Sequence, residues 1–344
     1  MNKKDGGGLE RLKADIKAGS PSNAYIICGC ESYLKDHYIS SLRKLILDGP
    51  MSDFNYKTVD GESFDANEFA SAVETMPSFS ERTLIEVRDL NIFALGEDDT
   101  AAFIDVISEL PEWCCVVFIF DALEYKADGR RKKLAAAVEA NIITVEINEQ
   151  SRSDLMKWII SHFKAHGKKI SAEDCEYLIF LCGPLMSGLN SEIEKIATWC
   201  EGDTVSRSDI DAVAVPVLEA AVFDLTDALS ERKFSKAADV LNTLMMLQNE
   251  PLQILGAIST NFRRMYALKI LKRNGSDAAS MKKTIKTNSD FYMNKLLTAA
   301  SGFGEKRLAR AVELCAKADF DMKASSAADS EPLTKLLISL CANG

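Results

Sequence analysis

The chain has 344 residues, of which 47% are hydrophobic, and it carries a formal net charge of −10. This length predicts two or three domains, and the hydrophobic fraction is ordinary for a protein with a sizeable core. The longest apolar runs are far too short to cross a bilayer, and no apolar segment follows the first lysines, so we expect neither a membrane anchor nor a signal peptide.

The first 150 residues alternate between helical and strand periodicity. After a helix over 9–18, we expect strands over 24–28, 54–60, 83–87, 115–120 and 142–147. The helices predicted between these strands are 32–47, 65–75, 98–109 and 130–140. An Asp65–Glu68 capping box opens the second of them. This alternation is typical of an α/β domain with a five-stranded, mainly parallel sheet that helices cover on both faces.

After Gln150 the pattern is helical, and we expect no further strand. A first group of helices is predicted over 152–165, 172–182, 189–201 and 207–213. A second group is predicted over 219–230, 234–247, 251–273, 277–286, 290–299, 305–322 and 332–342. The sequence therefore predicts an α/β domain over 1–150, a small helical domain over 151–213 and a larger all-α domain over 214–344.

The nine cysteines are scattered, and no CxxC pair is present. Several lie inside apolar runs: Cys28, Cys114, Cys115, Cys182 and Cys341. Buried, reduced thiols of a cytoplasmic protein explain this pattern better than a metal site does. We expect no metal.

The first strand, turn and helix read "YIICGCESYLKDHYISSLRK", the order in which many proteins bind a nucleotide phosphate. A phosphate-binding loop needs glycines, a lysine and a hydroxyl residue in G-x-x-x-x-G-K-[ST], and no segment of the chain fits. The turn offers Gly29, Cys30 and Glu31, and a glutamate repels a polyphosphate from the helix N-terminus. We interpret these three residues as a degenerate loop that binds no cofactor.

Two other parts of an ATP site are also missing. The third strand ends with Asp89 followed by Leu90, so it lacks a second carboxylate, and the fourth ends "FIFDAL" without a polar sensor. No G-x-S-x-G or H-E-x-x-H motif occurs, and the many acids make any one carboxylate pair weak support for catalysis. We expect no intrinsic catalysis.

The junction "ETMPSFSERTLIEV" places Phe79 between small polar residues just before the third strand. Such a junction belongs at the surface, because its backbone groups need hydration. Phe79 is either tucked back into the domain or an anchor for a partner's pocket, where its burial contributes about 1.5–3 kcal/mol.

Two basic segments stand out on this acidic chain. "GRRKK" at 129–133 begins a predicted helix, and residues 252–287 hold eight basic residues but one acid, Asp277. Each is either a solvated helix face or a contact with a polyanion.

In succession, "AYIICGCESYLKDHYI", "TMPSFSERTLIEV", "FIFDALEYKADGRRKKL", "GLNSEIEKI", "EPLQILGAISTNFRRMYALK" and "PLTKLLISLC" resemble the delta subunit family of bacterial DNA polymerase III. The resemblance spans essentially the whole chain. It implies an AAA+-like module, a lid domain and a collar domain through which five clamp-loader subunits assemble. It also implies a noncatalytic subunit of the DNA polymerase III holoenzyme, a DNA-directed DNA polymerase, in the bacterial cytoplasm and at the nucleoid during replication.

The resemblance assigns clamp binding to the loop before the third strand: Met76, Pro77, Ser78, Phe79, Ser80 and Arg82. Phe79 matches one of the family's two apolar residues, and Ser78 replaces the other. We expect this loop beside the degenerate phosphate loop, at a neighbouring edge of the sheet. The implied partners are the sliding clamp (beta subunit), the clamp-loader ATPase (gamma/tau), delta prime and primer–template DNA.

The basic segments supply candidate contacts with DNA or with sister subunits: Arg130, Arg131, Lys132, Lys133, Arg263 and Arg264. Two alternatives remain open, a catalytic AAA+ ATPase with an atypical nucleotide loop and a structural subunit of another DNA-repair ring. Nucleotide binding favours the first, and absence of clamp affinity favours the second.

Overall fold

A computed structural model describes residues 7–47, 51–78, 80–247, 249–324 and 330–342. The chain divides into an N-terminal unit, residues 1–149 with 185–187, and a C-terminal unit, residues 150–184 with 188–344. Within the described ranges, no helix combines the length and the apolar character needed to cross a membrane.

Five strands, all paired in parallel, form the centre of the N-terminal unit in the order β2-β3-β4-β1-β5. Their bounds are β1 (Ala24–Cys28), β2 (Tyr56–Asp60), β3 (Thr83–Arg88), β4 (Cys114–Ile119) and β5 (Ile143–Glu146). All residues of β1 and β4 are buried, as expected for central parallel strands covered on both faces. The predicted α/β fold is confirmed.

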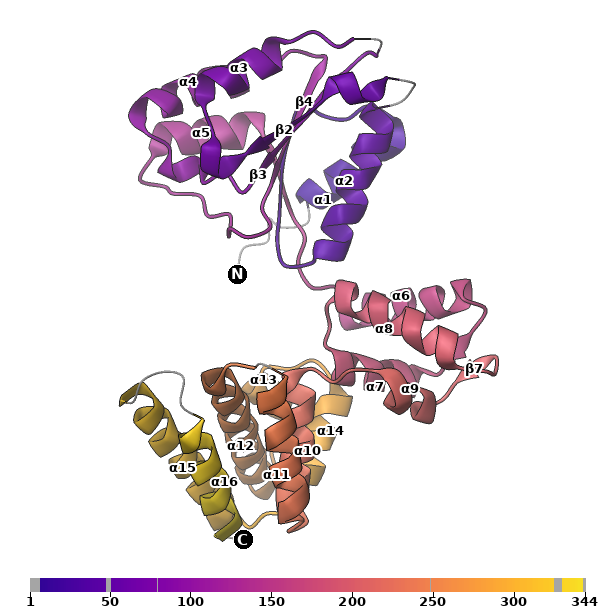
Figure 1. Cartoon of the computed structure of the whole chain (residues 1–344), viewed down its shortest axis with the longest axis vertical. Coiled ribbons are helices and arrows are strands. Elements are labelled where there is room, and N and C mark those ends of the chain that lie inside the picture. The colour runs from indigo at the N-terminus through magenta and orange to yellow at the C-terminus, as the bar shows by residue number, and fades with distance from the viewer. Residues whose placement is uncertain (1–6, 48–50, 79, 248, 325–329, 343–344) are drawn as a thin grey trace. The chain divides into compact units, whose positions relative to one another are not determined.

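Helices cover both faces of this sheet (Figure 1). They are α1 (Gly7–Ala18), α2 (Ser32–Ile46), α3 (Ala66–Glu74), α4 (Glu97–Ser108) and α5 (Lys132–Asn141). Alternate residues of β1 serve the two faces: Ile26 belongs to the core shared with α3, α4 and α5, whereas Tyr25 and Ile27 belong to the core shared with α1 and α2. Asp65 caps α3 by accepting from the amides of Asn67 and Glu68. The bond from the Glu68 amide to the Asp65 side chain is one of the two bonds of the predicted capping box, and it is confirmed.

The second predicted strand starts too early. Residues 52–55 form a short 3-10 helix, η1 (Ser52–Asn55), and β2 begins only at Tyr56. Met51 precedes η1 with a left-handed φ of 79°. The 3-10 helix that follows takes the first two residues of the predicted strand, and it places Phe54 at the surface while Asn55 is buried.

The C-terminal unit is mainly helical. Its first helices are α6 (Arg152–Ala165), α7 (Ala172–Cys182), α8 (Met186–Trp199), whose first two residues belong to the N-terminal unit, and α9 (Arg207–Val213). Our expectation of no strand after residue 150 was wrong, because β6 (Lys169–Ile170) and β7 (Thr204–Val205) pair in parallel. Two-residue strands carry too little periodicity to be recognised in a sequence.

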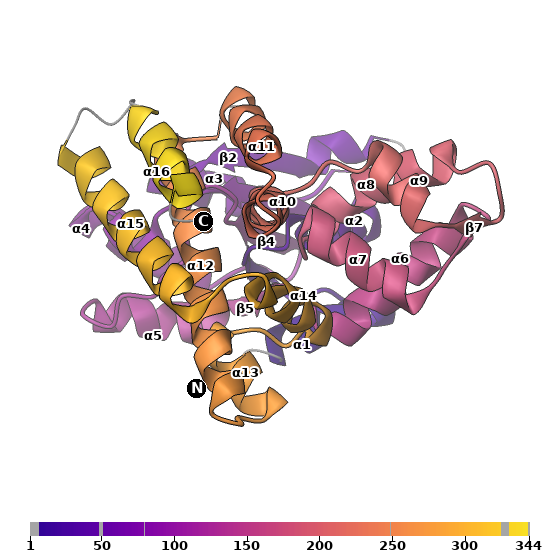
Figure 2. The same ribbon diagram turned by 90° about the horizontal axis from the view of Figure 1, so that it is seen from below.

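Seven further helices lie together (Figure 2). They share one large apolar core. They are α10 (Leu218–Ser230), α11 (Phe234–Met246), α12 (Pro251–Arg273), α13 (Ala278–Ile285), α14 (Asp290–Ser301), α15 (Glu305–Ala324) and α16 (Glu331–Ala342). Phe180 of α7 also packs on this group, with its ring 5.0 Å from that of Phe223. The division into lid and collar at residue 213 stays a prediction.

The cysteines are largely buried, as expected. Seven of the nine free thiols are buried, Cys341 is half-buried and Cys30 is exposed. Burial raises the pKa of Cys28 to about 11 and that of Cys115 to about 12, so both are protonated at neutral pH. Such thiols act as small apolar side chains.

Candidate functional site

The turn after β1 is shaped by its neighbour β5. Gly29 has a φ of +109°, and a Cβ atom there would lie 2.2 Å from the carbonyl oxygen of Ile147. The amide of Glu31 donates to the same carbonyl at 3.1 Å. Phosphate-binding loops leave such amides free for the ligand. Here Gly29 lets the turn approach Ile147, the residue after β5, and the amide of Glu31 is already bonded to that residue.

Glu31 itself is fully buried at the start of α2. Its Oε2 accepts from the amide of Met186 at 3.0 Å, whereas its Oε1 has no partner among the described residues. A carboxylate thus lies where a phosphate-binding loop leaves room for an anion. Its charge opposes the entry of a second anion.

Ion pairs link the ends of β3 and β4 to α2. The buried Nζ of Lys35 donates to the carbonyl of Phe120 and to Asp121 Oδ1, both at 2.7 Å. Arg88 joins the other oxygen of Asp121 at 2.9 Å. Lys35 is the lysine nearest to the degenerate loop in the sequence. It is therefore already paired with the carboxylate of Asp121.

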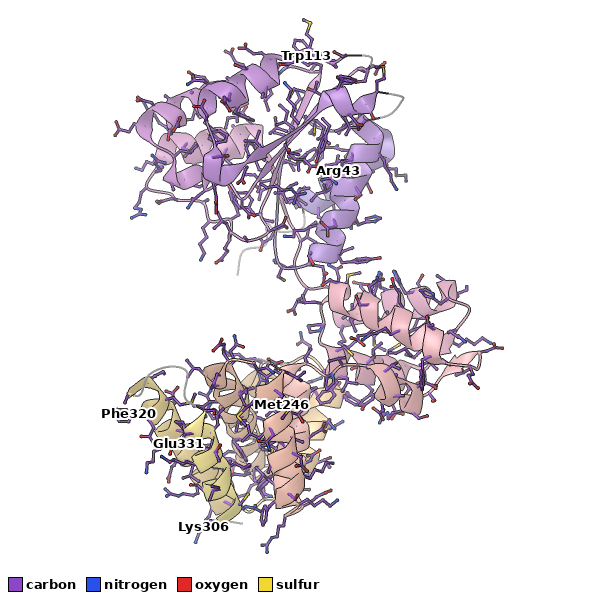
Figure 3. The ribbon with its side chains drawn as sticks, in the orientation of Figure 1. Arg43, Trp113, Met246, Lys306, Phe320 and Glu331 are labelled. Carbon is purple, nitrogen blue, oxygen red and sulfur yellow. The ribbon has the colours of Figure 1, made fainter. Side chains whose placement is uncertain are left out.

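On the same face of the sheet, Arg43 projects from α2 toward β3 (Figure 3). Its Nε and Nη2 both lie 2.5 Å from the fully buried carboxylate of Glu86, which also accepts from the hydroxyl of Tyr56 at 3.0 Å. Arg88 lies 3.4 Å from Glu86 and connects this pair to Asp121. The network fastens α2 to the sheet.

Asp89, the acid that ends β3, has a structural role. Its φ is 51°, and its Oδ1 accepts from the amides of Asp121, Ala122 and Leu123 at 2.8, 2.9 and 3.0 Å. Partial burial opposes ionisation, but these three donors outweigh it and lower the pKa of Asp89. The carboxylate holds the loop after β4 and has one oxygen saturated.

A cavity of about 510 Å³ opens at this carboxyl edge of the sheet, where open α/β sheets usually bind ligands. Three carboxylates from two segments line it: Asp121 and Glu124 from the loop after β4, and Glu146 from β5. Cys30 and Tyr125 add a thiol and a phenol ring to the lining. Such a lining disfavours a polyphosphate.

The loop of residues 76–82 lies at the other edge. It precedes β3, whereas the degenerate phosphate loop follows β1, and both strands pair in parallel with β4. The two loops therefore lie at opposite edges of the sheet. Our expectation that they lie at neighbouring edges was wrong, because position in a parallel sheet depends on which end of the strand a loop joins.

Buried Asn55 anchors the middle of this loop. Its Nδ2 donates to the carbonyl of Ser78 at 2.5 Å and to the hydroxyl of Ser80 at 2.9 Å, and its Oδ1 accepts from the amide of Ser78 at 2.6 Å. One amide side chain thus holds the residues on both sides of Phe79, which itself lies outside the described residues. The anchor restricts the backbone of Ser78 and the side chain of Ser80.

Arg82 anchors the end of the loop. Its guanidinium donates to the carbonyl of Pro21 at 2.5 Å and to Asn23 Oδ1 at 2.8 Å, and the Ser80 hydroxyl donates to the carbonyl of Arg82 at 2.8 Å. Arg82 and Ser80 therefore face inward and position the loop. Of the remaining residues assigned to it, Met76 and Ser78 are exposed and Pro77 is half-buried.

Asn55→Ala tests the anchor. It removes three hydrogen bonds from an exposed loop, where water replaces part of them, so we expect the free energy of unfolding to fall by about 1–2 kcal/mol. Hydrogen exchange at the Ser78 amide should accelerate at least about tenfold. Asn67→Ala, on the exposed side of α3, is the control. Unchanged exchange at Ser78 would refute the anchoring role.

The basic segment 130–133 is divided in its roles. Arg131 donates to the carbonyls of Phe93 and Leu95 at 2.9 and 2.8 Å and so fastens the start of α5 to the segment between β3 and α4. Exposed Arg130 is paired with Asp128 at 2.7 Å. Lys132 and Lys133 are exposed and are not in the ion pairs of the described chain. Lys132 and Lys133 therefore remain available to a polyanion, and exposed Arg130 would have to exchange Asp128 for one.

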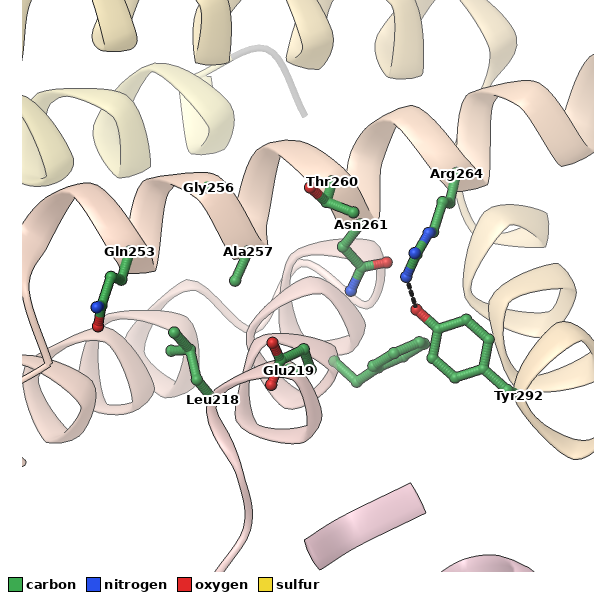
Figure 4. Close-up of a pocket in the computed structure, with 10 residues that line it drawn as sticks. Leu218, Glu219, Gln253, Gly256, Ala257, Thr260, Asn261, Arg264 and Tyr292 are labelled. Carbon is green, nitrogen blue, oxygen red and sulfur yellow. Dashed lines mark hydrogen bonds between the residues drawn. The ribbon is translucent and has the colours of Figure 1, made fainter. Parts of the chain in front are cut away.

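The basic residues of α12 also differ from each other. Arg264 lines a groove of about 550 Å³ between α10, α12 and α14, where it donates to the hydroxyl of Tyr292 at 2.6 Å (Figure 4). Gly256 lies in the same groove, and a Cβ added there would have no neighbouring atom within 4 Å. Arg263 is exposed and donates to the carbonyl of Ser259 at 3.3 Å.

Comparison with known structures defines the fold as that of a clamp-loader subunit. The solved Bacillus subtilis DNA clamp loader delta protein superimposes with a TM-score of 0.52, covering 97% of this chain and 99% of that one at 23% identity.

Sequence comparison identifies the family. The family model for DNA polymerase III, delta subunit, matches residues 25–148, and that for its C-terminal domain matches residues 219–340. The Bacillus subtilis DNA polymerase III subunit delta is 25% identical over 314 residues, 90% of each chain. A probable subunit delta of Aquifex aeolicus is 24% identical over 279 residues, 79% of this chain and 77% of its own. The chain belongs to the DNA polymerase III delta subunit family.

Proposed function

We propose that this delta subunit acts in a clamp loader, where it binds the sliding clamp and holds the ring open for loading onto primed DNA without hydrolysing ATP. Family membership supports the assignment to the loader. The observation that carries the clamp-binding role is the loop of residues 76–82, which Asn55 and Arg82 hold while Met76 stays exposed. A restrained loop loses less conformational entropy when it binds.

The carboxyl edge supports the absence of ATP hydrolysis. Glu31 fills the start of α2, Lys35 is paired with Asp121, and Asp89 accepts three backbone amides. Each group that would bind phosphate or magnesium is thus committed to the fold. A nucleotide would have to break these contacts before it could bind.

Ring opening requires differential binding. A shift of the ring from 1:99 to 99:1 in favour of the open form needs about 5.5 kcal/mol. One buried phenylalanine contributes about 1.5–3 kcal/mol, so Phe79 must act together with neighbouring surface. We propose that α3 and the loop act as one lever against a single clamp subunit.

The C-terminal unit is proposed to join the ATPase (gamma/tau) and delta prime subunits through a collar over 214–344, with residues 151–213 as the lid and 1–150 as the clamp-binding module. Large apolar side chains on its surface support this, notably Met246 and Phe320, which are 82% and 71% exposed (Figure 3). Exposed apolar side chains of this size commonly mark protein contacts. The exposed groove beside Gly256 allows a partner to approach the backbone of α12 closely.

Primer–template DNA is the proposed partner of the exposed cations Arg130, Lys132 and Lys133. Arg263 and Arg264 are assigned to subunit contacts instead, since Arg264 is already engaged with Tyr292. Phosphate contacts would make DNA binding by the assembled loader depend on salt. The proposed location is the bacterial cytoplasm, at the nucleoid during replication.

Capture of the sliding clamp by the purified chain without nucleotide tests the proposal. The chain should bind the clamp of its own organism and show no ATP turnover above a blank. ATP turnover by the chain would instead support the catalytic alternative. Absence of clamp binding, with the chain folded, would support a subunit of another ring.

A further inference from the structure

Exposed apolar side chains lie at the start of the anchored loop and in the adjoining segment before β2. Met51, Phe54 and Met76 are 53%, 68% and 70% exposed. They account for three of the five large apolar side chains that are exposed on the described part of the N-terminal unit; Leu123 and Leu185 are the others. We call these three residues the η1 patch. Such a concentration on one small surface is typical of a protein contact.

Topology explains why these residues meet. Phe54 precedes β2 and Met76 lies in the segment that precedes β3, and β2 and β3 are adjacent parallel strands with Tyr56 opposite Leu84. The segments that enter neighbouring parallel strands lie side by side at the amino edge. Asn55, next to Phe54 in the chain, then bonds both Ser78 and Ser80. η1 and the loop form one restrained surface.

The backbone of η1 is also unusual. Met51 holds the left-handed conformation, which L-residues other than glycine, asparagine and aspartate rarely adopt. The turn brings Met51 and Phe54 together, with the Phe54 amide donating to the Met51 carbonyl at 3.2 Å. Strained conformations of this kind persist mainly where the surrounding structure requires them, often at binding surfaces.

Acidic residues flank the patch. Asp53, Glu74 and Glu81 are exposed, and none of them forms an ion pair with another described residue. An apolar centre with a charged rim is the usual anatomy of a protein interface. The acids would favour a partner whose apolar pocket has a basic rim.

We propose that Phe54 and Met51 form a second apolar contact with the sliding clamp, continuous with Met76 at the start of the loop of residues 76–82. This inference rests on the proposed clamp-binding function. It also accounts for Ser78, which stands where the family has a larger apolar residue: the apolar area missing from the loop is supplied by η1. The partner is thereby specified as one clamp subunit that contacts both segments at once.

Calorimetric titration of the full chain with the sliding clamp of the same organism tests this inference. Phe54→Ala should weaken binding about 10- to 100-fold, because a phenylalanine buried at an interface contributes that much to affinity. Phe54→Leu keeps most of the apolar area and should recover affinity to within about fivefold of wild type. Leu123→Ala is the matched control, since Leu123 is an exposed apolar residue of the same unit at the opposite, carboxyl edge.

The outcomes separate this inference from the proposed function. If Phe54→Ala binds the clamp as tightly as Leu123→Ala does, while Phe79→Ala binds it weakly, the η1 patch plays no part in clamp binding. The loop then remains the clamp site. If the wild-type chain fails to bind the clamp, the proposed function itself falls. Loss of affinity in Phe54→Ala, with its recovery in Phe54→Leu and an unchanged tryptophan emission spectrum, supports the second contact. Loss that leucine does not recover would overturn it.

Discussion

Replacing Gly29 by alanine is expected to destabilise the N-terminal unit by about 3–5 kcal/mol. The added Cβ would lie 2.2 Å from the carbonyl oxygen of Ile147, and the φ of +109° is strained for any L-residue. The atom it meets is backbone, so relief requires β5 to move away from β1. That movement would also break the bond between the Glu31 amide and Ile147. A glycine at the position of a phosphate loop is thus needed for the sheet.

Tryptophan fluorescence in urea can report this effect on the N-terminal unit alone. Trp113 is the single tryptophan of that unit, so Trp158→Phe and Trp199→Phe remove the signal of the rest of the chain. Gly129→Ala is the matched control, because no atom lies within 4 Å of the added Cβ and its φ is not left-handed. Its effect should stay within about 0.5 kcal/mol. Equal midpoints for the two variants would contradict the structural role of Gly29.

Phe79→Ala is expected to weaken binding of the sliding clamp about 10- to 100-fold. The substitution removes an aromatic side chain that contributes about 1.5–3 kcal/mol when it enters a pocket. The anchors on both sides of Phe79 remain, because Asn55 bonds the backbone of Ser78 and the hydroxyl of Ser80. The loss should therefore appear in affinity and leave the stability of the unit nearly unchanged.

Titration of the purified variant against the clamp measures this loss. Phe320→Ala, an exposed phenylalanine of the C-terminal unit, controls for the removal of any surface ring. Its affinity for the clamp should equal that of wild type. If Phe79→Ala bound the clamp within about twofold of the wild-type affinity, the proposal that this loop acts as a lever on the clamp would be wrong.

Most of the fold can be predicted from periodicity. The run "AYIIC" gives β1 its observed bounds, and α12 begins and ends where its apolar pattern does. η1 escapes prediction because "DFNYKTVD" has the alternation of a strand, whereas the left-handed turn at Met51 begins a 3-10 helix that delays the start of β2 to Tyr56. Local pattern does not encode that turn.

The site is predicted less completely, because its important bonds join residues far apart in the chain. The absence of a phosphate loop is visible in the sequence, but the pairing of Lys35 with Asp121 across 86 positions is not. Arg82 and Arg131 look like surface cations in the sequence, yet both donate to backbone carbonyls of distant segments. Asn55 was missed altogether. A polar residue in an otherwise strand-like run was the one signal that pointed to it.

Release of the sliding clamp from circular DNA, without nucleotide, tests the central claim most directly. The clamp is first placed on nicked circular DNA, and its loss from the circle is followed after addition of the purified chain. The account predicts faster release by the wild-type chain, with no ATP present, and a much smaller effect of Phe79→Ala. Release that needs ATP, or a clamp that stays on the circle while the chain is bound to it, would contradict the account.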